Sequence, residues 1–367
     1  MKIIFRLCFL ALLSIYFPTL LIAQKSDTHI PDYPIRKGVS APFAGFAGST
    51  LIVAGGGCNF PDKPAAEGGK KVYYSQIYSL TPGNTSKQWQ EQTPLPIPVA
   101  YGASIETKDG LVCIGGMNND STSTAVFRIE ISHSNPETVL ISNLPSLSVG
   151  IDNAAAARIG NILYITGGNQ PQQKKALYML SMEQPESWKK LPDYPGKQRV
   201  QPTLVGTDNF LYLAGGFAFD STTKTCTLST DILRYDPSTE EWKIETSIPP
   251  YPDNTPRCLV GSSGIAYGDY LIFTGGVYAP LFKEAMEGKQ DDQYLKHEPT
   301  WYQFHDDLLI YHTTDKSWKI IPHVAGMAKA GGVLLRKGNT LYMICGEIKP
   351  GIRTAEIPVI SLSDLLK

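Results

Sequence analysis

The stretch that decides the fold is "LYLAGG", residues 211–216, an apolar run that ends in a glycine doublet. Runs of the same form occur at intervals of 48 to 70 residues along the chain. They are "LIVAGG" (51–56), "LVCIGG" (111–116), "LYITGG" (163–168), "LIFTGG" (271–276) and an eroded copy, "LYMICG" (341–346). A period of about 50 residues is typical of kelch repeats, in which each copy forms one propeller blade. The sequence therefore predicts six blades.

Aromatic residues at fixed positions after the doublets support the repeat. A tyrosine lies in the next strand and a tryptophan opens the strand after it, as in Tyr78/Trp89, Tyr178/Trp188, Tyr235/Trp242 and Tyr311/Trp318. A single four-stranded sheet cannot bury both faces, so such sheets stack around an axis, where glycine permits close backbone approach. We expect an all-β, six-bladed kelch β-propeller with one short helical insert within residues 281–300.

The two ends of the chain complement each other. The last repeat ends at "AEIPVISLSDLLK" (355–367) with one strand missing, and "DTHIPDYPI" (27–35) precedes the first repeat. We expect this N-terminal segment to form the outer strand of the last blade. Closing the ring in this way removes a free sheet edge that would invite aggregation.

The first 23 residues have the pattern of a cleaved signal peptide. Lys2 and Arg6 precede an apolar stretch, and the small residue Ala23 precedes a polar run. The expected organisation is a signal peptide (1–23) followed by one propeller domain (24–367), exported to the periplasm. A retained membrane anchor is the alternative, but the apolar stretch is short for a span.

Composition limits the partners and cofactors. The formal net charge is −1 and no cluster of Lys or Arg stands out, so the sequence favours neither nucleic acid nor membrane binding after signal removal. Five cysteines follow residue 23, an odd number, so at least one is unpaired. The histidines lack close metal-ligand spacing, and no phosphate loop is present. We therefore expect no metal site and no cofactor.

One face of the propeller should hold the site. Because strands alternate in direction, loops from the second strand to the third and segments between blades emerge on the same face, where function is usually found. This face collects an insertion, Val277–His305, and a hairpin in which Glu347 and Arg353 flank a Lys-Pro-Gly turn. Four other polar residues are candidates for substrate binding on this face: Glu67, Tyr101, Arg199 and Arg257.

Each candidate has a structural interpretation beside the functional one. Glu347 and Arg353 form either a catalytic pair or an ordinary cross-hairpin ion pair, which is worth little when exposed. Glu67 is either a second acid or a solvated loop residue, and Tyr101 either contacts a sugar or packs at the blade mouth. Arg199 and Arg257 either bind a carboxylate or pair with neighbouring acids.

Two segments carry a family resemblance. "GEIKPGIRT" (346–354) and "APFAGFAGSTLIVAGG" (41–56) resemble the bacterial N-acetylneuraminate epimerases, the kelch-type sialic acid mutarotases, with the blades in rotated order. The chain is thus similar to a cyclically permuted branch of that family. The resemblance implies that Glu347 and Arg353 are the catalytic pair and that sialic acid is the substrate. Cys345 departs from the related pattern, which has Asn there.

Two other classes share the fold. A secreted kelch scaffold could bind protein or glycan without catalysis, but it would not need the Glu347/Arg353 hairpin. A copper-radical oxidase needs a set of Tyr, His and Cys ligands that this sequence does not visibly assemble.

Overall fold

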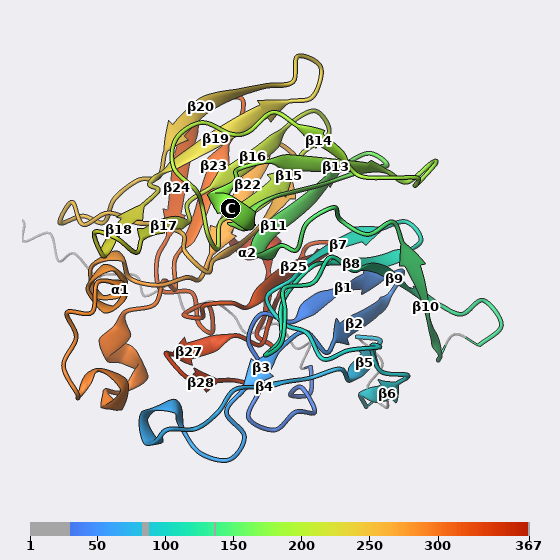
Figure 1. The fold of residues 1–367 in the computed structure, drawn as a ribbon, viewed down its shortest axis with the longest axis horizontal. Coiled ribbons are helices and arrows are strands. Elements are labelled where there is room, and N and C mark those ends of the chain that lie inside the picture. The colour runs from blue at the N-terminus through green and yellow to red at the C-terminus, as the bar shows by residue number, and fades with distance from the viewer. Residues whose placement is uncertain (1–29, 83–87, 136, 366–367) are drawn as a thin grey trace, which may run out of the picture.

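The computed structural model describes residues 30–365 except 83–87 and 136, and it forms six antiparallel sheets in a ring (Figure 1). The predicted six-bladed propeller is confirmed. Blade I contains β1 (Phe43–Ala47), β2 (Thr50–Ala54), β5 (Ile77–Leu80) and β6 (Gln90–Gln92). Blade II contains β7 (Ala103–Thr107), β8 (Gly110–Ile114), β9 (Val126–Ile131) and β10 (Val139–Leu144). Blade III contains β11 (Asp152–Ile159), β12 (Ile162–Asn169), β13 (Leu177–Ser181) and β14 (Lys189–Leu191).

Blades IV and V have the same order, and blade VI follows it with three strands. Blade IV contains β15 (Thr203–Gly206), β16 (Leu211–Ala214), β19 (Asp231–Asp236) and β20 (Glu241–Ser247). Blade V contains β21 (Ser263–Tyr267), β22 (Tyr270–Thr274), β23 (Leu308–His312) and β24 (Ser317–Ile321). Blade VI contains β25 (Val333–Lys337), β26 (Thr340–Ile344) and β29 (Val359–Ser361).

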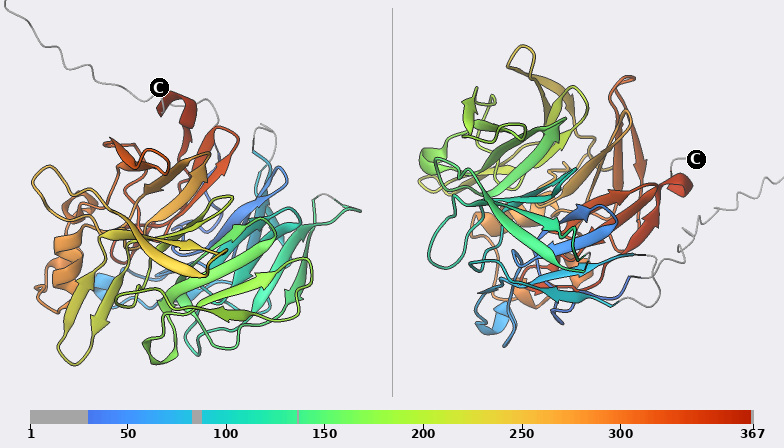
Figure 2. Two further views of the ribbon diagram at one scale, coloured as in Figure 1. Left: turned by 90° about the horizontal axis from the view of Figure 1, so that it is seen from above. Right: turned by 90° about the vertical axis from the view of Figure 1, so that its right-hand side faces the viewer.

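Loops between the second and third strands carry three small hairpins. These pair β3 (Cys58–Asn59) with β4 (Val72–Tyr73), β17 (Phe217–Asp220) with β18 (Thr225–Leu228), and β27 (Glu347–Lys349) with β28 (Ile352–Arg353). Helical segments are short: η1 (Ala65–Glu67), η2 (Pro171–Gln173), α1 (Ala279–Met286), η3 (Tyr294–Lys296), η4 (Pro299–Tyr302) and α2 (Leu362–Leu365). The helical insert is therefore confirmed, although α1 begins before residue 281. In Figure 2, α2 lies at the outer rim, close to the C-terminus.

The glycine doublets lie where the chain leaves the second strand of a blade. Gly115 and Gly116 have φ values of 63° and 95°, and a Cβ atom on Gly116 would lie 2.7 Å from the carbonyl oxygen of Ala100. A side chain there would be both strained and obstructed. In the eroded sixth doublet, Cys345 adopts the same left-handed conformation, with φ 52°.

A closed ring of six backbone hydrogen bonds surrounds the axis. One residue in each segment that enters a blade has a left-handed conformation, and its N–H donates to the carbonyl of the equivalent residue in the preceding blade, at 2.6–3.2 Å. The first of these, Ala41, donates to the last, Gly331, so the junction between blades VI and I has the same bond as the others. The six residues in order are Ala41, Tyr101, Asn153, Gln201, Gly261 and Gly331.

Apolar cores fill the spaces between neighbouring blades, and the tryptophans of the repeat lie at their outer ends. Three of them, all except Trp318, donate the indole N–H to a proline carbonyl in the segment that precedes their own blade. The pairs are Trp89 to Pro31 (3.0 Å), Trp188 to Pro145 (2.8 Å) and Trp242 to Pro192 (3.3 Å). The first pair places the N-terminal segment in a position equivalent to the linkers that follow β10 and β14.

The sequence of that segment repeats the linker after β14. "IPDYP" (30–34) corresponds to "LPDYP" (191–195), and the Tyr33 ring packs edge-on against Trp89 as Tyr194 packs against Trp242. The expectation of a strand is wrong for Ile30–Ile35, because Pro31 and Pro34 have no N–H to donate to a ladder. Instead, Tyr33 N–H donates to the carbonyl of Ala355 at 2.8 Å.

The remaining part of the expected outer strand, before Ile30, lies outside the described residues, as does the signal peptide (1–23). Both stay predictions. In the part of the chain that the structure describes, blade VI has three strands, and no helix is long and apolar enough to cross a membrane.

Candidate functional site

The hairpin β27/β28 brings Glu347 and Arg353 together, as the sequence predicted. The two residues are cross-strand partners, and Arg353 Nη2 lies 2.5 Å from Glu347 Oε1. Gly351 has φ 81°, the conformation that the third position of a type II turn requires, and its N–H donates to the same carboxylate oxygen at 3.3 Å. The backbone of Glu347 also pairs with that of Ala330 in the segment entering blade VI. The turn therefore fixes the carboxylate beside the guanidinium.

The two charges differ in burial. The Arg353 side chain is 1% exposed, whereas that of Glu347 is 24% exposed. The guanidinium lies over the ring of Phe60, 4.6 Å from its centroid, and its Nε donates to Ser40 Oγ at 3.4 Å. This is not the exposed ion pair of the structural interpretation. The guanidinium is held in one plane, and the carboxylate remains accessible.

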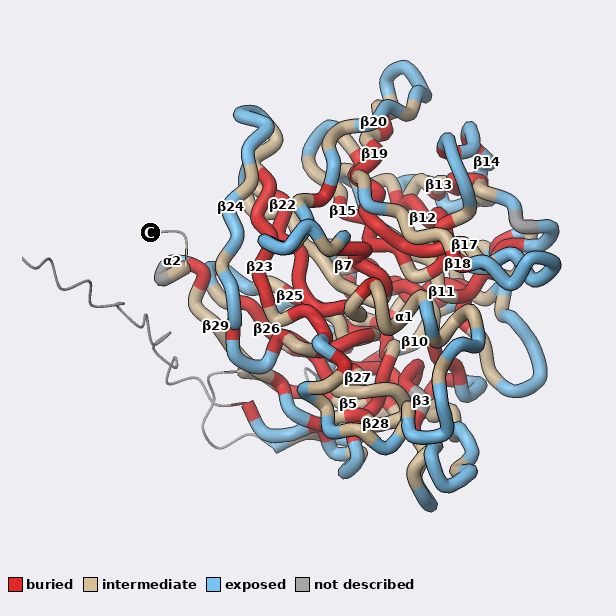
Figure 3. The backbone as a smooth tube through the Cα atoms, turned by 90° about the vertical axis from the view of Figure 1, so that its left-hand side faces the viewer, coloured by how far each residue is buried: buried red, intermediate tan, exposed pale blue. Residues whose placement is uncertain are grey.

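Loops of both neighbouring blades pack against the hairpin. From blade I, η1 approaches so closely that a Cβ atom on Gly351 would lie 2.7 Å from the side chain of Ala65. From blade V, η4 contacts β27, and Lys349 Nζ donates to the His297 carbonyl at 2.5 Å. The two loops also meet, because η1 contacts η3. Figure 3 shows α1, β27, β28 and β3 on the face turned to the viewer.

Glu67 and Tyr101 lie on the same side as the hairpin. Glu67 is exposed at the end of η1. Tyr101 belongs to the axial ring and bonds to Ala41, the neighbour of Ser40, and its hydroxyl accepts a hydrogen bond from Lys71 at 3.3 Å. Both residues therefore lie on the face that holds the hairpin and stay candidates for substrate binding.

Arg199 and Arg257 have acidic partners instead. Arg199 Nη2 lies 2.7 Å from Asp231, and Arg257 Nη2 lies 2.6 Å from Asp307. Both arginines are 4% exposed, and each also donates to backbone carbonyls. The structure thus favours the structural interpretation, in which each of these guanidinium groups ties loops together by donating to a carboxylate and to backbone carbonyls at the same time.

One group of side chains within the described residues has the composition of a metal site. Asp306, Asp307 and His323 offer ligand atoms within 4.8 Å of one another. The carboxylate of Asp307 is engaged by Arg257, however, and His323 is 83% exposed. The arrangement is that of a surface ion-pair cluster.

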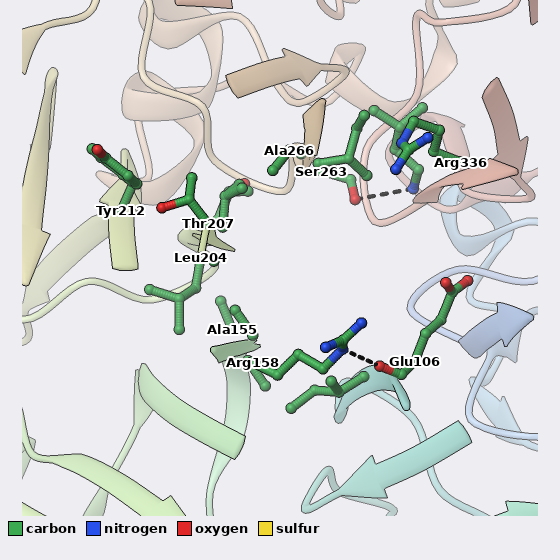
Figure 4. A pocket seen from close by; sticks show the side chains of 18 of the residues that line it. Glu106, Ala155, Arg158, Leu204, Thr207, Tyr212, Ser263, Ala266 and Arg336 are labelled. Atoms are coloured by element: carbon green, nitrogen blue, oxygen red, sulfur yellow. Dashed lines mark hydrogen bonds between the residues drawn. The ribbon is translucent and has the colours of Figure 1, made fainter. Parts of the chain in front are cut away.

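A cavity of about 880 Å³ occupies the axial channel at the opposite end from the hairpin. It is lined by turns that join first and second strands, whereas β27/β28 follows the end of a second strand. Glu106, Arg158 and Arg336 are among the residues that line it (Figure 4), and burial raises the pKa of Glu106. Among the described residues that line the cavity there is none of the six candidates.

Several contacts of the site were not predicted from the sequence. Phe60 and Ser40 support Arg353, and Tyr294 lies in the loop of blade V that packs on the hairpin. Aromatic and hydroxyl side chains in loops are common, so no sequence signal distinguished these three. Only their position near the Glu347/Arg353 pair marks these residues as part of the site.

Fold and hairpin together define a class of protein, a six-bladed β-propeller whose loop face holds an accessible carboxylate against a buried guanidinium. A family model described as "NANM: N-acetylneuraminate epimerase" matches residues 144–365, more than half of the chain. The chain belongs to this family.

Curated relatives carry the same name. The N-acetylneuraminate epimerase of Haemophilus influenzae (strain 86-028NP) is 31% identical over 246 residues, which is 64% of this chain and 62% of the relative. That of Vibrio vulnificus (strain YJ016) is 28% identical over 240 residues, 60% of each chain. The chain thus spans about three fifths of the length of these relatives.

A solved structure, "Structure of YjhT", has the same fold. Its TM-score is 0.64 at 16% identity, and the match covers 89% of this chain and 95% of that chain.

Proposed function

We propose that this protein is a mutarotase that interconverts the α and β anomers of N-acetylneuraminate by acid/base opening and closure of the sugar ring. The observation that carries the proposal is the 2.5 Å contact between an accessible carboxylate, Glu347, and a guanidinium, Arg353, that is 1% exposed. Family membership indicates the substrate, and the hairpin supplies groups suited to the chemistry.

Glu347 is the group that moves the proton. Opening the ring requires a base to remove the proton from the anomeric hydroxyl, and closing it requires an acid to return that proton. A carboxylate performs both steps in turn, a role that typically contributes about 10²–10⁴-fold to the rate. The partial exposure of Glu347 leaves an oxygen accessible to a sugar.

Arg353 orients the substrate. The carboxylate of N-acetylneuraminate is attached to the anomeric carbon, so a guanidinium that binds it places the anomeric hydroxyl beside Glu347. Phe60 and Ser40 fix the plane of this guanidinium before the sugar arrives. Such preorganisation lowers the cost of orienting the reacting groups. We assign Glu67 and Tyr101 to contacts with the hydroxyl or acyl groups of the sugar.

The test is a measurement of anomer exchange. Freshly released α-N-acetylneuraminate is followed by NMR with and without the protein, at fixed pH and after subtraction of the spontaneous rate. We expect wild-type protein to accelerate exchange and Glu347→Gln to abolish most of that acceleration. If wild-type protein leaves the exchange rate at its spontaneous value, the function is not mutarotation of this sugar.

We also propose that the chain is a cyclic permutation of the family's usual kelch blade order and is exported. The family match begins at residue 144, although residues 30–143 contribute two blades to the same ring, and this supports a changed blade order. A chain reopened in the linker between β10 and β11, with its present ends linked, should remain active. Export predicts that residues 1–23 direct a passenger protein to the periplasm, and retention of that passenger in the cytoplasm would contradict it.

A further inference from the structure

Ring opening needs a second proton. When the bond between the anomeric carbon and the ring oxygen breaks, the electron pair stays on the ring oxygen, which must be protonated. Glu347 is taking up a proton at that moment and cannot supply one. A separate acid is required on the other side of the breaking bond.

Tyr294 belongs to the loop of blade V whose η4 packs against β27 of the hairpin. It lies in η3, which meets η1, and its ring packs edge-on against Trp301 and Tyr302. Ala330, whose backbone pairs with Glu347 in both directions, belongs to the same apolar cluster. The cluster is therefore continuous from Tyr294 to the backbone of the catalytic carboxylate.

The phenol of Tyr294 is uncommitted. Within the described residues its oxygen forms no hydrogen bond, whereas the Tyr302 hydroxyl donates to the Tyr294 carbonyl. That bond and the two ring contacts hold the residue in place without using its hydroxyl. Burial, followed by the neighbouring Tyr302 and Glu347, raises the pKa of Tyr294 to about 12, so the phenol is protonated at neutral pH, as a donor must be.

We propose that Tyr294 is the general acid that protonates the ring oxygen, opposite Glu347. This inference rests on the proposed mutarotase function and adds a catalytic residue to it. The nearest competitor is Tyr101, whose hydroxyl already accepts a hydrogen bond from Lys71.

Every proton that is transferred in the reaction is accounted for without a cofactor. Glu347 takes the proton of the anomeric hydroxyl, the carbon–ring oxygen bond breaks, the carbonyl forms, and the Tyr294 proton passes to the ring oxygen. After the open chain rotates, the same hydroxyl attacks the other face of the carbonyl. Its proton returns to Tyr294, and the proton on Glu347 returns to the new anomeric oxygen.

Tyr294→Phe tests the role, because it removes the hydroxyl and keeps the ring contacts. We expect the maximal exchange rate to fall by about 10²-fold or more with a change in KM of less than about threefold. Tyr278→Phe, in the same insertion, is the matched control and should exchange the anomers like wild type. Melting curves of both variants should match that of wild type.

A fluorinated tyrosine at position 294 separates a proton donor from a packing residue. Its phenol is more acidic, so the alkaline decline of the enzymatic rate should move to lower pH, which a purely structural role would not cause. If Tyr294→Phe retains the wild-type rate while Glu347→Gln loses it, the Tyr294 proposal is overturned and the mutarotase proposal stands. If Tyr101→Phe alone shows the rate loss, Tyr101 is the acid.

Discussion

Replacing Glu347 by Gln should affect the rate of anomer exchange, the stability of the protein and its affinity for the sugar in different ways. Loss of an ordinary ion pair would lower only the stability. Glutamine keeps the size of the side chain and one carbonyl acceptor for Arg353, but it removes the negative charge. The rate of anomer exchange should fall by about 10²–10⁴-fold, because an amide cannot accept the proton.

The stability effect follows from the burial of Arg353. Its side chain is 1% exposed and would lose its charged partner, so a hydrogen bond to a charged acceptor (about 1.5–3 kcal/mol) becomes one to a neutral acceptor (about 0.5–1.5 kcal/mol). The Phe60 ring and Ser40 Oγ remain in contact with the guanidinium. The free energy of unfolding should therefore fall by about 1–2 kcal/mol, which for a domain of this size lowers Tm by about 1–3 °C.

The affinity for an anionic sugar should change in the opposite direction. In the proposed complex, the carboxylate of the sugar acid would lie beside Arg353 and would be repelled by Glu347. Two like charges about 4 Å apart interact by about 1 kcal/mol in water. Removing one of them should tighten binding by about fivefold.

The assays are exchange NMR for the rate, thermal melting for stability, and calorimetric titration with the methyl α-glycoside of N-acetylneuraminate, which cannot open its ring. Arg353→Lys is the matched variant, and it should weaken binding, because a point charge replaces a planar bidentate donor. A Glu347→Gln variant that exchanges the anomers at the wild-type rate, or that binds the glycoside more weakly, would refute the reasoning.

Four further predictions concern other parts of the molecule. Burial lowers the pKa of Lys329 from 10.5 to about 8, so replacing Lys329 by Met should stabilise the protein by about 1–3 kcal/mol below pH 8. The difference in the free energy of unfolding between the two proteins should shrink between about pH 8 and 10.5. A difference that stays constant over this range would contradict this linkage. Tyr33→Ala should lower the free energy of unfolding in denaturant by about 3–5 kcal/mol, since this 2% exposed ring packs between blades VI and I. Deletion of residues 24–36 should give an aggregating protein. A truncated chain as heat-resistant as wild type would show that the N-terminal segment does not close the ring. Anomer exchange should survive treatment with EDTA, and a loss that only a divalent ion restores would point to a metal such as one at Asp306 and His323.

The repeat could be predicted from the sequence because its signals are local. A glycine doublet permits positive φ and close backbone approach, and Gly116 illustrates both. The Glu347/Arg353 pair was also predictable, since the two residues flank a turn that Pro350 and Gly351 favour.

Contacts between distant segments were not predictable in the same way. Arg199 and Asp231 are 32 residues apart, and Arg257 and Asp307 are 50 apart, so nothing local indicates that these arginines already have partners. The burial of Arg353 under Phe60 likewise depends on two blades being neighbours in the ring. Arg353 is buried while Glu347 is partly exposed, and this difference distinguishes the pair from an ordinary surface ion pair. It arises from tertiary packing, so the local sequence does not show it.

The axial ring explains how a rotated blade order can keep the same site. Each of the six hydrogen bonds joins a backbone N–H to a carbonyl in the preceding blade, and the bond from Ala41 to Gly331 differs from the others only in that no chain connects blade VI to blade I. The hydrogen bonds of the ring therefore do not depend on which junction between blades holds the chain ends. The hairpin, by contrast, depends on its spatial neighbours, because Phe60 and η1 come from blade I and η3 and η4 from blade V. A permutation that moves the chain ends to another junction leaves both neighbours in place. Insertion of an extra blade between VI and I would instead remove Phe60 and Ser40 from Arg353, so the order of blades around the ring, and not along the chain, is what the proposed chemistry requires.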